Sequence, residues 1–201
     1  MQNADAPPVH RSLGIILVGC HAPTMESGTL TRRAALGGMA VVGVAVGDAL
    51  ALEPNWLDVS VHEVGVRALP SSLDGFSVAQ VTDAHLDSLG AVEEAIVAAV
   101  REHNVQLVAL TGDLVDSTSL LNSLGAFLGQ LATTQARLVA SLGNWEHWGR
   151  IPREDLAKTY RDAGAALLVN ESLTLREGVT VFATDDSTGG RGISCACSGC
   201  V

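Results

Sequence analysis

The stretch "FSVAQVTDAHLD", residues 76–87, runs from a short apolar segment directly into polar residues. Residues 76–81 predict a buried β-strand, because aromatic and β-branched side chains are frequent there and turn residues flank them. Asp83 and His85 follow at the carboxyl end of that strand. Ligands of open α/β sheets collect beyond the carboxyl ends of the strands, so this junction predicts both a strand and a site.

The same kind of junction occurs twice more along the chain. "VQLVALTGD", residues 105–113, and "ARLVASLGN", residues 136–144, are apolar segments that end in polar residues. Segments with helical spacing separate these strands, while an earlier strand and a later hairpin flank them. The expected elements besides the three strands are a strand over 59–66, helices over 91–104, 120–131 and 153–164, and a hairpin over 173–184. This alternation predicts an α/β fold with parallel strands.

Length and composition favour one folded domain that does not bind nucleic acid. The chain has 201 residues, of which 47% are hydrophobic, so it can bury one sizeable core. Its formal net charge is -10, and no cluster of Lys or Arg opposes that charge. A polyanionic backbone is repelled by such a protein, so nucleic-acid binding is not expected.

Residues 25–51 have the layout of an export signal. Arg32 and Arg33 form a pair, an uncharged run covers 34–47, and the small-residue pattern Ala-Leu-Ala ends at Ala51. This layout predicts a twin-arginine signal peptide that engages the twin-arginine export machinery. The uncharged run is shorter than the roughly 20 residues that cross a bilayer. The mature protein is therefore expected outside the cytoplasm, in the periplasm or associated with the cell envelope.

The two ends of the chain do not fit this layout. Because Met25 begins a signal of ordinary length, residues 1–24 are interpreted as a non-native segment from an over-extended reading frame. The alternative is a lipid-anchored protein tethered through Cys20, which ends a lipobox-like "LVGC". The cysteine-rich residues 191–201 are interpreted as a frame-shifted tail.

The polar residues at the strand ends have the chemistry of metal ligands. Hard and borderline divalent cations take carboxylate oxygen, amide oxygen and imidazole nitrogen. Asp83, His85, Asp113 and Asn144 supply these three donor types from three successive strand ends, and Asp116 is expected to brace its loop. The alternative is that Asp83 and Asp113 are ordinary loop acids that satisfy backbone amides.

Three blocks of this sequence resemble the motifs of the calcineurin-like metallophosphoesterase family, which are D-x-H, G-D-x-x-D and G-N-H-[DE]. They read "DAH" at 83–85, "GDLVD" at 112–116 and "GNWE" at 143–146. The resemblance covers roughly residues 53–190 and is closest to the exported twin-arginine branch with membrane-associated phosphodiesterases. It implies a metallophosphoesterase domain over 52–190 with a layered α/β/β/α sandwich, incomplete at the C-terminus.

The resemblance also implies a function and a set of ligands. Two divalent metal ions (Mn, Fe or Zn) are expected, one held by Asp83, His85 and Asp113 and the other by Asp113 and Asn144. A hydroxide activated by both metals would hydrolyse a phosphoester, as a phosphodiesterase or pyrophosphatase does. A lipid- or envelope-linked substrate and association with a membrane surface are further expectations.

The chain departs from the family pattern in two places. Trp145 stands where the family has a histidine that protonates the leaving group, and His147 follows two positions later. His147 either reaches the same space or packs between Trp145 and Trp148; Asn144 and His147 are the expected catalytic residues. The family's later lone histidine and its G-H-x-H block do not occur, since His147 is the last histidine.

Two functions therefore remain in contention. The first is a metal-dependent phosphoester hydrolase impaired by C-terminal truncation. The second is an inactive fragment that binds a metal or a phosphate group without turnover. Glu146 is expected to orient its loop by accepting backbone hydrogen bonds, and Asp185 and Asp186 are interpreted as turn residues without a function.

Overall fold

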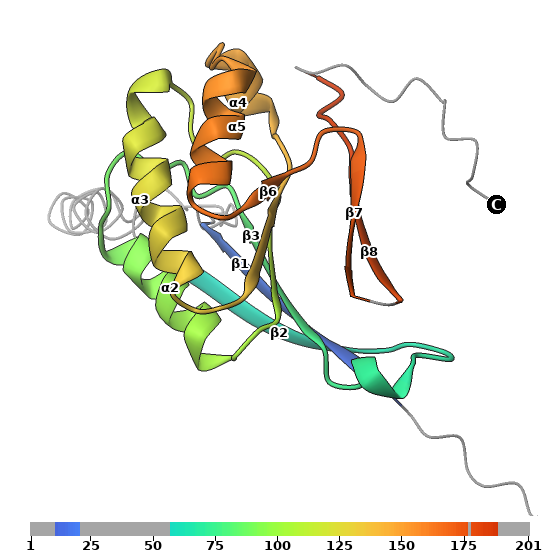
Figure 1. The fold of residues 1–201 in the computed structure, drawn as a ribbon. Helices are drawn as coiled ribbons and strands as arrows, with labels where there is room; N and C mark the ends of the chain where they lie inside the picture. Colours follow the sequence, from blue (N-terminus) through green and yellow to red (C-terminus); the bar gives the residue numbers. More distant parts are fainter. Residues whose placement is uncertain (1–10, 21–56, 177, 189–201) are drawn as a thin grey trace, which may run out of the picture.

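The structure is a computed structural model, and it describes residues 11–20, 57–176 and 178–188. These residues form a six-stranded sheet, three helices of ten or more residues and a separate hairpin (Figure 1). The order of the sheet is β2-β1-β3-β4-β5-β6, with bounds β2 Leu57–Gly65, β1 Ser12–Cys20, β3 Ser77–Thr82, β4 Leu107–Leu110, β5 Arg137–Ala140 and β6 Ala166–Leu167.

Strands β1, β3, β4, β5 and β6 run parallel, and only the edge strand β2 is antiparallel to its neighbour. The apolar residues of β3 and β4 explain this arrangement, because strands covered on both faces have few polar positions. Ala79, Val81 and Val108 are fully buried. The predicted α/β fold with parallel strands is confirmed, and the predicted strands over 59–66, 76–81, 105–113 and 136–144 are present with shifted or shorter bounds.

Strand β1 departs from the expected domain boundary. Residues 1–24 were expected outside the domain, whereas β1 lies inside the sheet, antiparallel to β2 and parallel to β3. Ile16 and Val18 point into the core and are buried. The β-branched residues of "GIILV" suit a strand, which is the physical reason for the difference. Residues 1–10 and 21–24, the predicted signal over 25–51 and the predicted tail over 191–201 lie outside the described residues.

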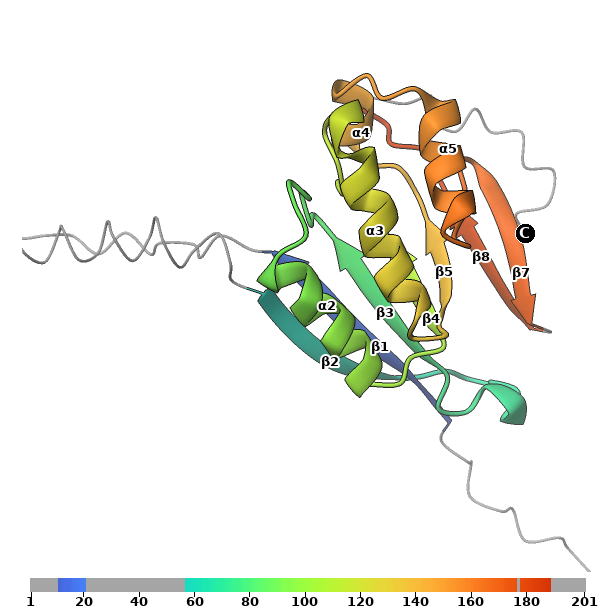
Figure 2. The same cartoon turned by 60° about the vertical axis from the view of Figure 1, so that its left-hand side comes forward.

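Helices α2 (Ala91–Glu102), α3 (Leu121–Ala132) and α5 (Arg153–Asp162) lie on one face of the sheet (Figure 2). Their apolar residues recur at helical spacing and form the main core against the sheet. Phe127 and Tyr160 are the largest of the side chains that are completely buried there. The three predicted helices are thus confirmed. No helix in the described ranges is long and apolar enough to cross a bilayer.

The hairpin of β7 (Glu171–Arg176) and β8 (Val179–Ala183) covers part of the opposite face. Leu173, Leu175 and Val181 from the hairpin pack against Leu107 and Val139 of the sheet. The hairpin was predicted over 173–184, so it too is confirmed. With helices on one face and a hairpin on the other, the described residues form the predicted α/β sandwich.

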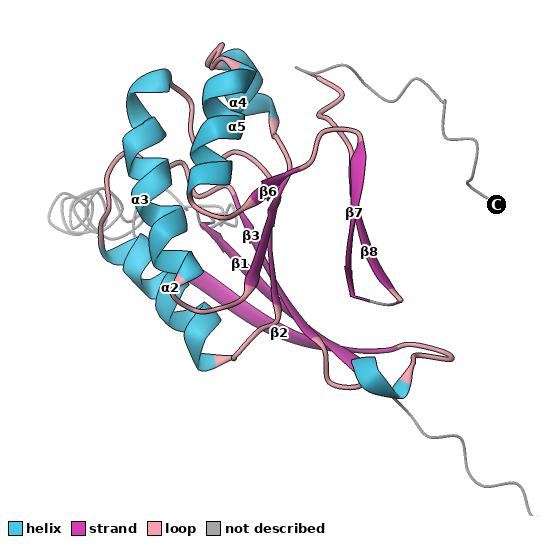
Figure 3. Cartoon of the chain, viewed as in Figure 1, coloured by secondary structure: helices cyan, strands magenta, loops and turns pink. Residues whose placement is uncertain are grey.

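The short elements lie in the connections. Two 3-10 turns, η2 (Ser71–Leu73) and η3 (Thr118–Leu120), precede β3 and α3. A five-residue helix, α4 (Asn144–Trp148), follows β5 directly, as the colouring by secondary structure shows (Figure 3). Glu146 was expected to lie in a loop, whereas residues 144–148 are helical, so the structure corrects that expectation. The carboxyl ends of β3, β4 and β5 lie at one edge of the sheet, where α4 begins (Figure 2).

Candidate functional site

Backbone hydrogen bonds bring the first two polar loops together. The amide of Asp83 donates to the Gly112 carbonyl at 3.3 Å, and the amide of His85 donates to the Asp113 carbonyl at 3.1 Å. The next pair continues this pattern, since the Leu86 amide donates to Leu114 at 2.7 Å. The loop after β3 therefore runs alongside the loop after β4, with Asp83, His85 and Asp113 on neighbouring backbone.

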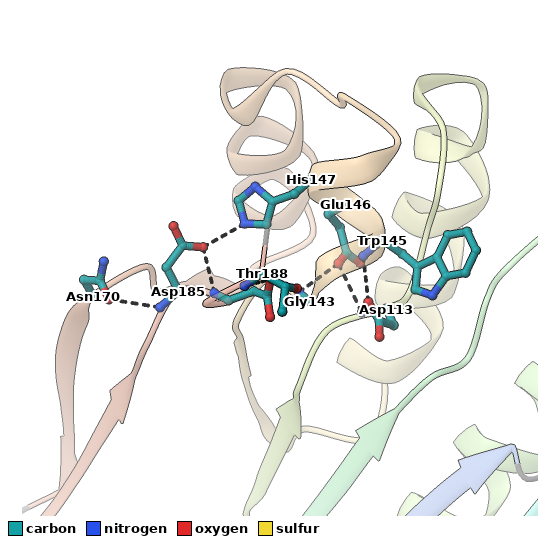
Figure 4. Close-up of polar contacts among 9 residues, drawn as sticks. Asp113, Gly143, Trp145, Glu146, His147, Asn170, Asp185 and Thr188 are labelled. Carbon is teal, nitrogen blue, oxygen red and sulfur yellow. Dashed lines mark hydrogen bonds and ion pairs between the residues drawn. The ribbon is translucent and has the colours of Figure 1, made fainter. Parts of the chain in front are cut away.

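The buried carboxylate of Glu146 joins the third loop to the second (Figure 4). Its two oxygens accept backbone N–H groups of Asp113 at 3.1 Å, Leu114 at 2.7 Å, Val115 at 3.3 Å and Gly143 at 2.9 Å. The residue is only 2% exposed, and hydrogen bonds to an ionised acceptor are about twice as strong as neutral ones. The prediction that Glu146 orients its loop through backbone hydrogen bonds is confirmed.

Two glycines permit this close approach. A Cβ atom at Gly112 would overlap the backbone of Gly143, and one at Gly143 would overlap the backbone and carboxylate of Asp113. Gly112 also has a φ of +93°, a conformation that L side chains rarely adopt. The glycines of "TGD" and "LGN" are therefore required by the contact between the two loops.

Three of the predicted ligands have strained backbone. The φ angles are +55° at Asp83, +41° at His85 and +56° at Asp113. Non-glycine residues in this left-handed region are uncommon, and such strain concentrates at functional sites, where surrounding contacts maintain it. Here the hydrogen bonds between the loops and to Glu146 supply those contacts.

The candidate ligands are near one another but do not enclose an ion. Asp83 accepts a hydrogen bond from the Thr82 hydroxyl at 2.7 Å, and Asp113 accepts one from the Trp145 amide at 2.9 Å, so each carboxylate keeps one oxygen for another ligand. In the described part of the chain, no three His, Cys, Asp or Glu side chains are gathered closely enough to hold a metal. The donors thus fit a divalent cation by chemical type and loop position, while their side chains are not gathered around one point.

Helix α4 separates Trp145 from His147. Residues two positions apart on an α-helix project roughly 200° apart, so these two side chains leave α4 in opposite directions. The Trp145 ring meets the His85 ring edge-on, with 5.3 Å between the ring centroids. It also contacts the Trp148 ring, with 5.5 Å between the centroids. His147 instead pairs with Asp185, Nε2 to Oδ1, at 2.8 Å (Figure 4). The residue beside His85 is therefore Trp145, and His147 faces the segment that follows β8.

Asp185 was not recognised as a site residue from the sequence. Its carboxylate is hydrogen-bonded to the His147 ring, and its backbone amide donates to the Asn170 side chain at 3.0 Å. Its side chain is 8% exposed. The signal in the sequence was its position: Asp185 comes just after the apolar strand β8, as Asp83 comes just after β3.

A cavity of about 540 Å³ has two of the candidate ligands, Asp113 and Asn144, in its lining. Its lining residues have polar side chains apart from one leucine and one glycine, and they come from the ends of β4, β5 and β8: Thr111, Asp113, Ser141, Leu142, Gly143, Asn144, Thr184, Asp185, Asp186 and Ser187. No Lys or Arg of the described residues lines it. A second cavity of about 600 Å³ lies at the other end of the strands, beside Phe76, Gln106 and Arg137, far from these donors.

Tyr160 lies in the core near this site. Its hydroxyl is buried and has no hydrogen-bond partner among the described residues. Burial, and after it the negative charge of Glu146, raises the pKa of Tyr160. The phenol is therefore neutral and takes no part in proton transfer at ordinary pH.

Comparisons with known proteins agree with these motifs. The family described as calcineurin-like phosphoesterase matches residues 76–195. An uncharacterized metallophosphoesterase of Bacillus subtilis (strain 168), YkuE, is 27% identical over 124 residues. That alignment covers 56% of this chain and 41% of the relative, so the matched region spans about two fifths of the relative's length. No solved structure matches the chain. The family match covers more than half of the sequence and includes all three motif loops, so the chain belongs to the calcineurin-like phosphoesterase family.

Proposed function

We propose that this chain hydrolyses phosphoesters in a metal-dependent reaction, as a phosphodiesterase or pyrophosphatase. Proteins of this family generally use divalent metal ions, and family membership suggests phosphoester hydrolysis. The observation that carries the proposal is the packing of the three motif loops against one another, joined by backbone hydrogen bonds and by the Glu146 carboxylate. This packing brings the three sets of oxygen and nitrogen donors to one edge of the sheet.

The residues divide between two proposed metal positions. Asp83, His85 and Asp113 would hold one ion, and Asp113 and Asn144 the other, with Mn, Fe or Zn as the ions. A divalent ion supplies Lewis-acid polarisation of a phosphoryl oxygen and lowers the pKa of water. The chain itself supplies the ligands, the amide group of Asn144 as a hydrogen-bond donor to phosphate, and a cavity at the strand ends.

The charge of the cavity supports a requirement for metal. Asp113, Asp185 and Asp186 line it, and none of its described lining residues is Lys or Arg. A phosphate ester is an anion, and like charges in a partly enclosed space repel each other strongly. The described lining residues carry no positive charge that could neutralise the phosphate, so hydrolysis should depend on an added cation.

Hydrolysis of bis-p-nitrophenyl phosphate tests the proposal. We expect turnover with added Mn²⁺, Fe²⁺ or Zn²⁺, none with a chelator, and a loss of at least about 100-fold in kcat/KM for Asp113→Asn. Asp162→Asn is the control, because Asp162 pairs with Lys158 on the outer surface of α5. Absence of turnover with every metal would contradict the proposal.

A second candidate function is binding of a metal or phosphate group without turnover. It is favoured by the absence of any gathered group of three metal-binding side chains in the described ranges. The pairing of His147 with Asp185 also favours it, because His147 then faces away from His85. Calorimetry that records binding of Mn²⁺ or inorganic phosphate, together with no hydrolysis, would select this function.

We also propose a lipid- or envelope-linked substrate and export through residues 25–51, with association at a membrane surface. Trp145 and Trp148 are 39% and 58% exposed, and the Trp145 ring contacts both His85 and Trp148, so an apolar group attached to the phosphate has a surface to contact. The signal itself lies outside the described residues. Fractionation of cells that express the full chain tests export, and cytoplasmic recovery alone would contradict it.

A further inference from the structure

Helix α4 is anchored by two adjacent side chains that reach different parts of the fold. The helix spans only Asn144–Trp148, too short to be stable by its own hydrogen bonds. Glu146 binds the backbone of the loop after β4. His147 binds Asp185 in the segment after β8. These two side-chain contacts, together with the Trp145 amide that donates to Asp113, therefore hold α4 in its orientation.

Two anchors in different directions fix a helix more completely than one. Consecutive residues on an α-helix project about 100° apart, so Glu146 and His147 hold α4 from two sides. Without His147, α4 would be held only on the side that faces the loop after β4, by Glu146 and by the Trp145 amide, and it could tilt away from the segment after β8. Asn144 is on the same turn of α4, so its direction changes with any such tilt.

Asp185 is itself held in place. Its backbone amide donates to the Asn170 side chain at 3.0 Å, and its Oδ1 also accepts the Asp186 amide at 3.0 Å. The two side chains of the pair are 22% exposed at His147 and 8% at Asp185. A largely buried, hydrogen-bonded pair loses little to competition from water, so this contact is a fixed point.

The pair also joins two walls of the cavity beside the ligands. Asn144, at the start of α4, lines one side, and residues 184–187 line another. The bond between His147 and Asp185 ties α4 to that second segment. Loss of the bond would let the two walls separate.

We propose that Asp185 is a positioning residue, which acts through His147 to fix the direction of Asn144 and so the affinity of the metal site. The proposal rests on the proposed function in that it takes the site to bind a metal. It assigns His147 a role in orienting α4, and it gives a role to an aspartate that the motifs of the sequence leave unassigned.

Calorimetric titration of the full chain with Mn²⁺ tests this role. Asp185→Ala should weaken Mn²⁺ binding about tenfold, as loss of a supporting contact at a metal site does. Asp185→Asn should bind like the wild type, because its amide oxygen still accepts from His147. His147→Phe removes the donor of the same hydrogen bond. The double variant His147→Phe with Asp185→Ala should bind Mn²⁺ no more weakly than Asp185→Ala alone, because both changes break one bond. Asp162→Ala, which removes a distant surface carboxylate, should bind normally.

Equal affinity of Asp185→Ala and wild type, or an equal loss in Asp185→Asn, would overturn the proposal. If the wild type binds no Mn²⁺, the proposed function fails. The role of Asp185 in holding α4 is then tested by hydrogen exchange in the metal-free protein. The Trp145 amide, bonded to Asp113, should then exchange its hydrogen faster in Asp185→Ala than in the wild type. An unchanged exchange rate would overturn the role of Asp185 independently of any metal.

Discussion

The Tyr160 hydroxyl occupies the core without a hydrogen-bond partner in the described part of the chain. Burial and the nearby charge of Glu146 both oppose ionisation of this phenol and raise its pKa. An unpaired buried hydroxyl costs about 1–3 kcal/mol of stability. Removal of this hydroxyl should therefore raise the free energy of unfolding.

We expect Tyr160→Phe to raise the free energy of unfolding at pH 7 by about 1 kcal/mol, because it removes an unsatisfied polar group and keeps the ring. Below the unfolded-state pKa of about 10, the phenol is neutral in both the folded and the unfolded chain. Because the folded-state pKa of Tyr160 is raised, above about pH 10 the phenol ionises first in the unfolded chain, and the free energy of unfolding of the wild type falls. Tyr160→Phe has no phenol and should not show this fall. Urea unfolding of both proteins at pH 7 and in alkaline buffer measures both effects. A wild type and variant with parallel pH profiles would contradict the prediction.

Individual residues of the site were predictable to different degrees. The donor types and strand-end positions of Asp83 and Asp113 follow from the sequence, and so does the loop-orienting role of Glu146. Asp185 was missed because its partner His147 is far away in the sequence and no motif links them. The direction of His147 depended on whether residues 144–148 are extended or helical.

At the scale of the elements, the strand and helix periodicities were sufficient to predict the long elements. The helices over 91–102, 121–132 and 153–162 each bury an apolar face, which gives a periodic signal. Helix α4 gave no such signal, since one turn is too short for a period and its stability comes from side-chain anchors. Strand β6 has only two residues, and pairing with β5 defines it.

The contact between the loops after β4 and β5 can be tested with a matched pair of glycine substitutions. Gly112→Ala should lower the free energy of unfolding by about 3 kcal/mol or more, because the methyl group overlaps Gly143 and φ is +93°. Gly129 lies within α3, and a Cβ atom added there would meet open space. Gly129→Ala should therefore raise the free energy of unfolding by about 0.5–1 kcal/mol. Chemical unfolding of both variants measures the difference. Similar stabilities would show that the two loops are not packed as described.

At the scale of the whole molecule, the sheet is continuous only because β1 lies between β2 and β3. The sequence predicted β2, β3, β4 and β5 from local patterns, but the neighbours of a strand are set by contacts far away in the chain. The short apolar run at residues 13–18 was equally consistent with a signal-like segment. Cleavage after Ala51 during export would remove β1 together with the proposed signal. If β1 is needed in the sheet, a chain without residues 1–24 should be less stable than the full chain. If residues 1–24 are a non-native segment, that shorter chain should be as stable as the full chain.

Deleting residues 1–24 distinguishes these expectations. In the structure, β1 pairs along its whole length with β2 and with every residue of β3, and it buries Ile16 and Val18. Burial of an aliphatic side chain contributes about 1.5–3 kcal/mol, so the chain 25–201 should be less stable by about 3–6 kcal/mol. It should also aggregate, because the facing edges of β2 and β3 lose their partner. Urea unfolding and light scattering measure both effects, and the chain 11–201, which keeps β1, is the control and should behave like the full chain. A chain 25–201 that is as stable and soluble as the full chain would show that the sheet does not need β1.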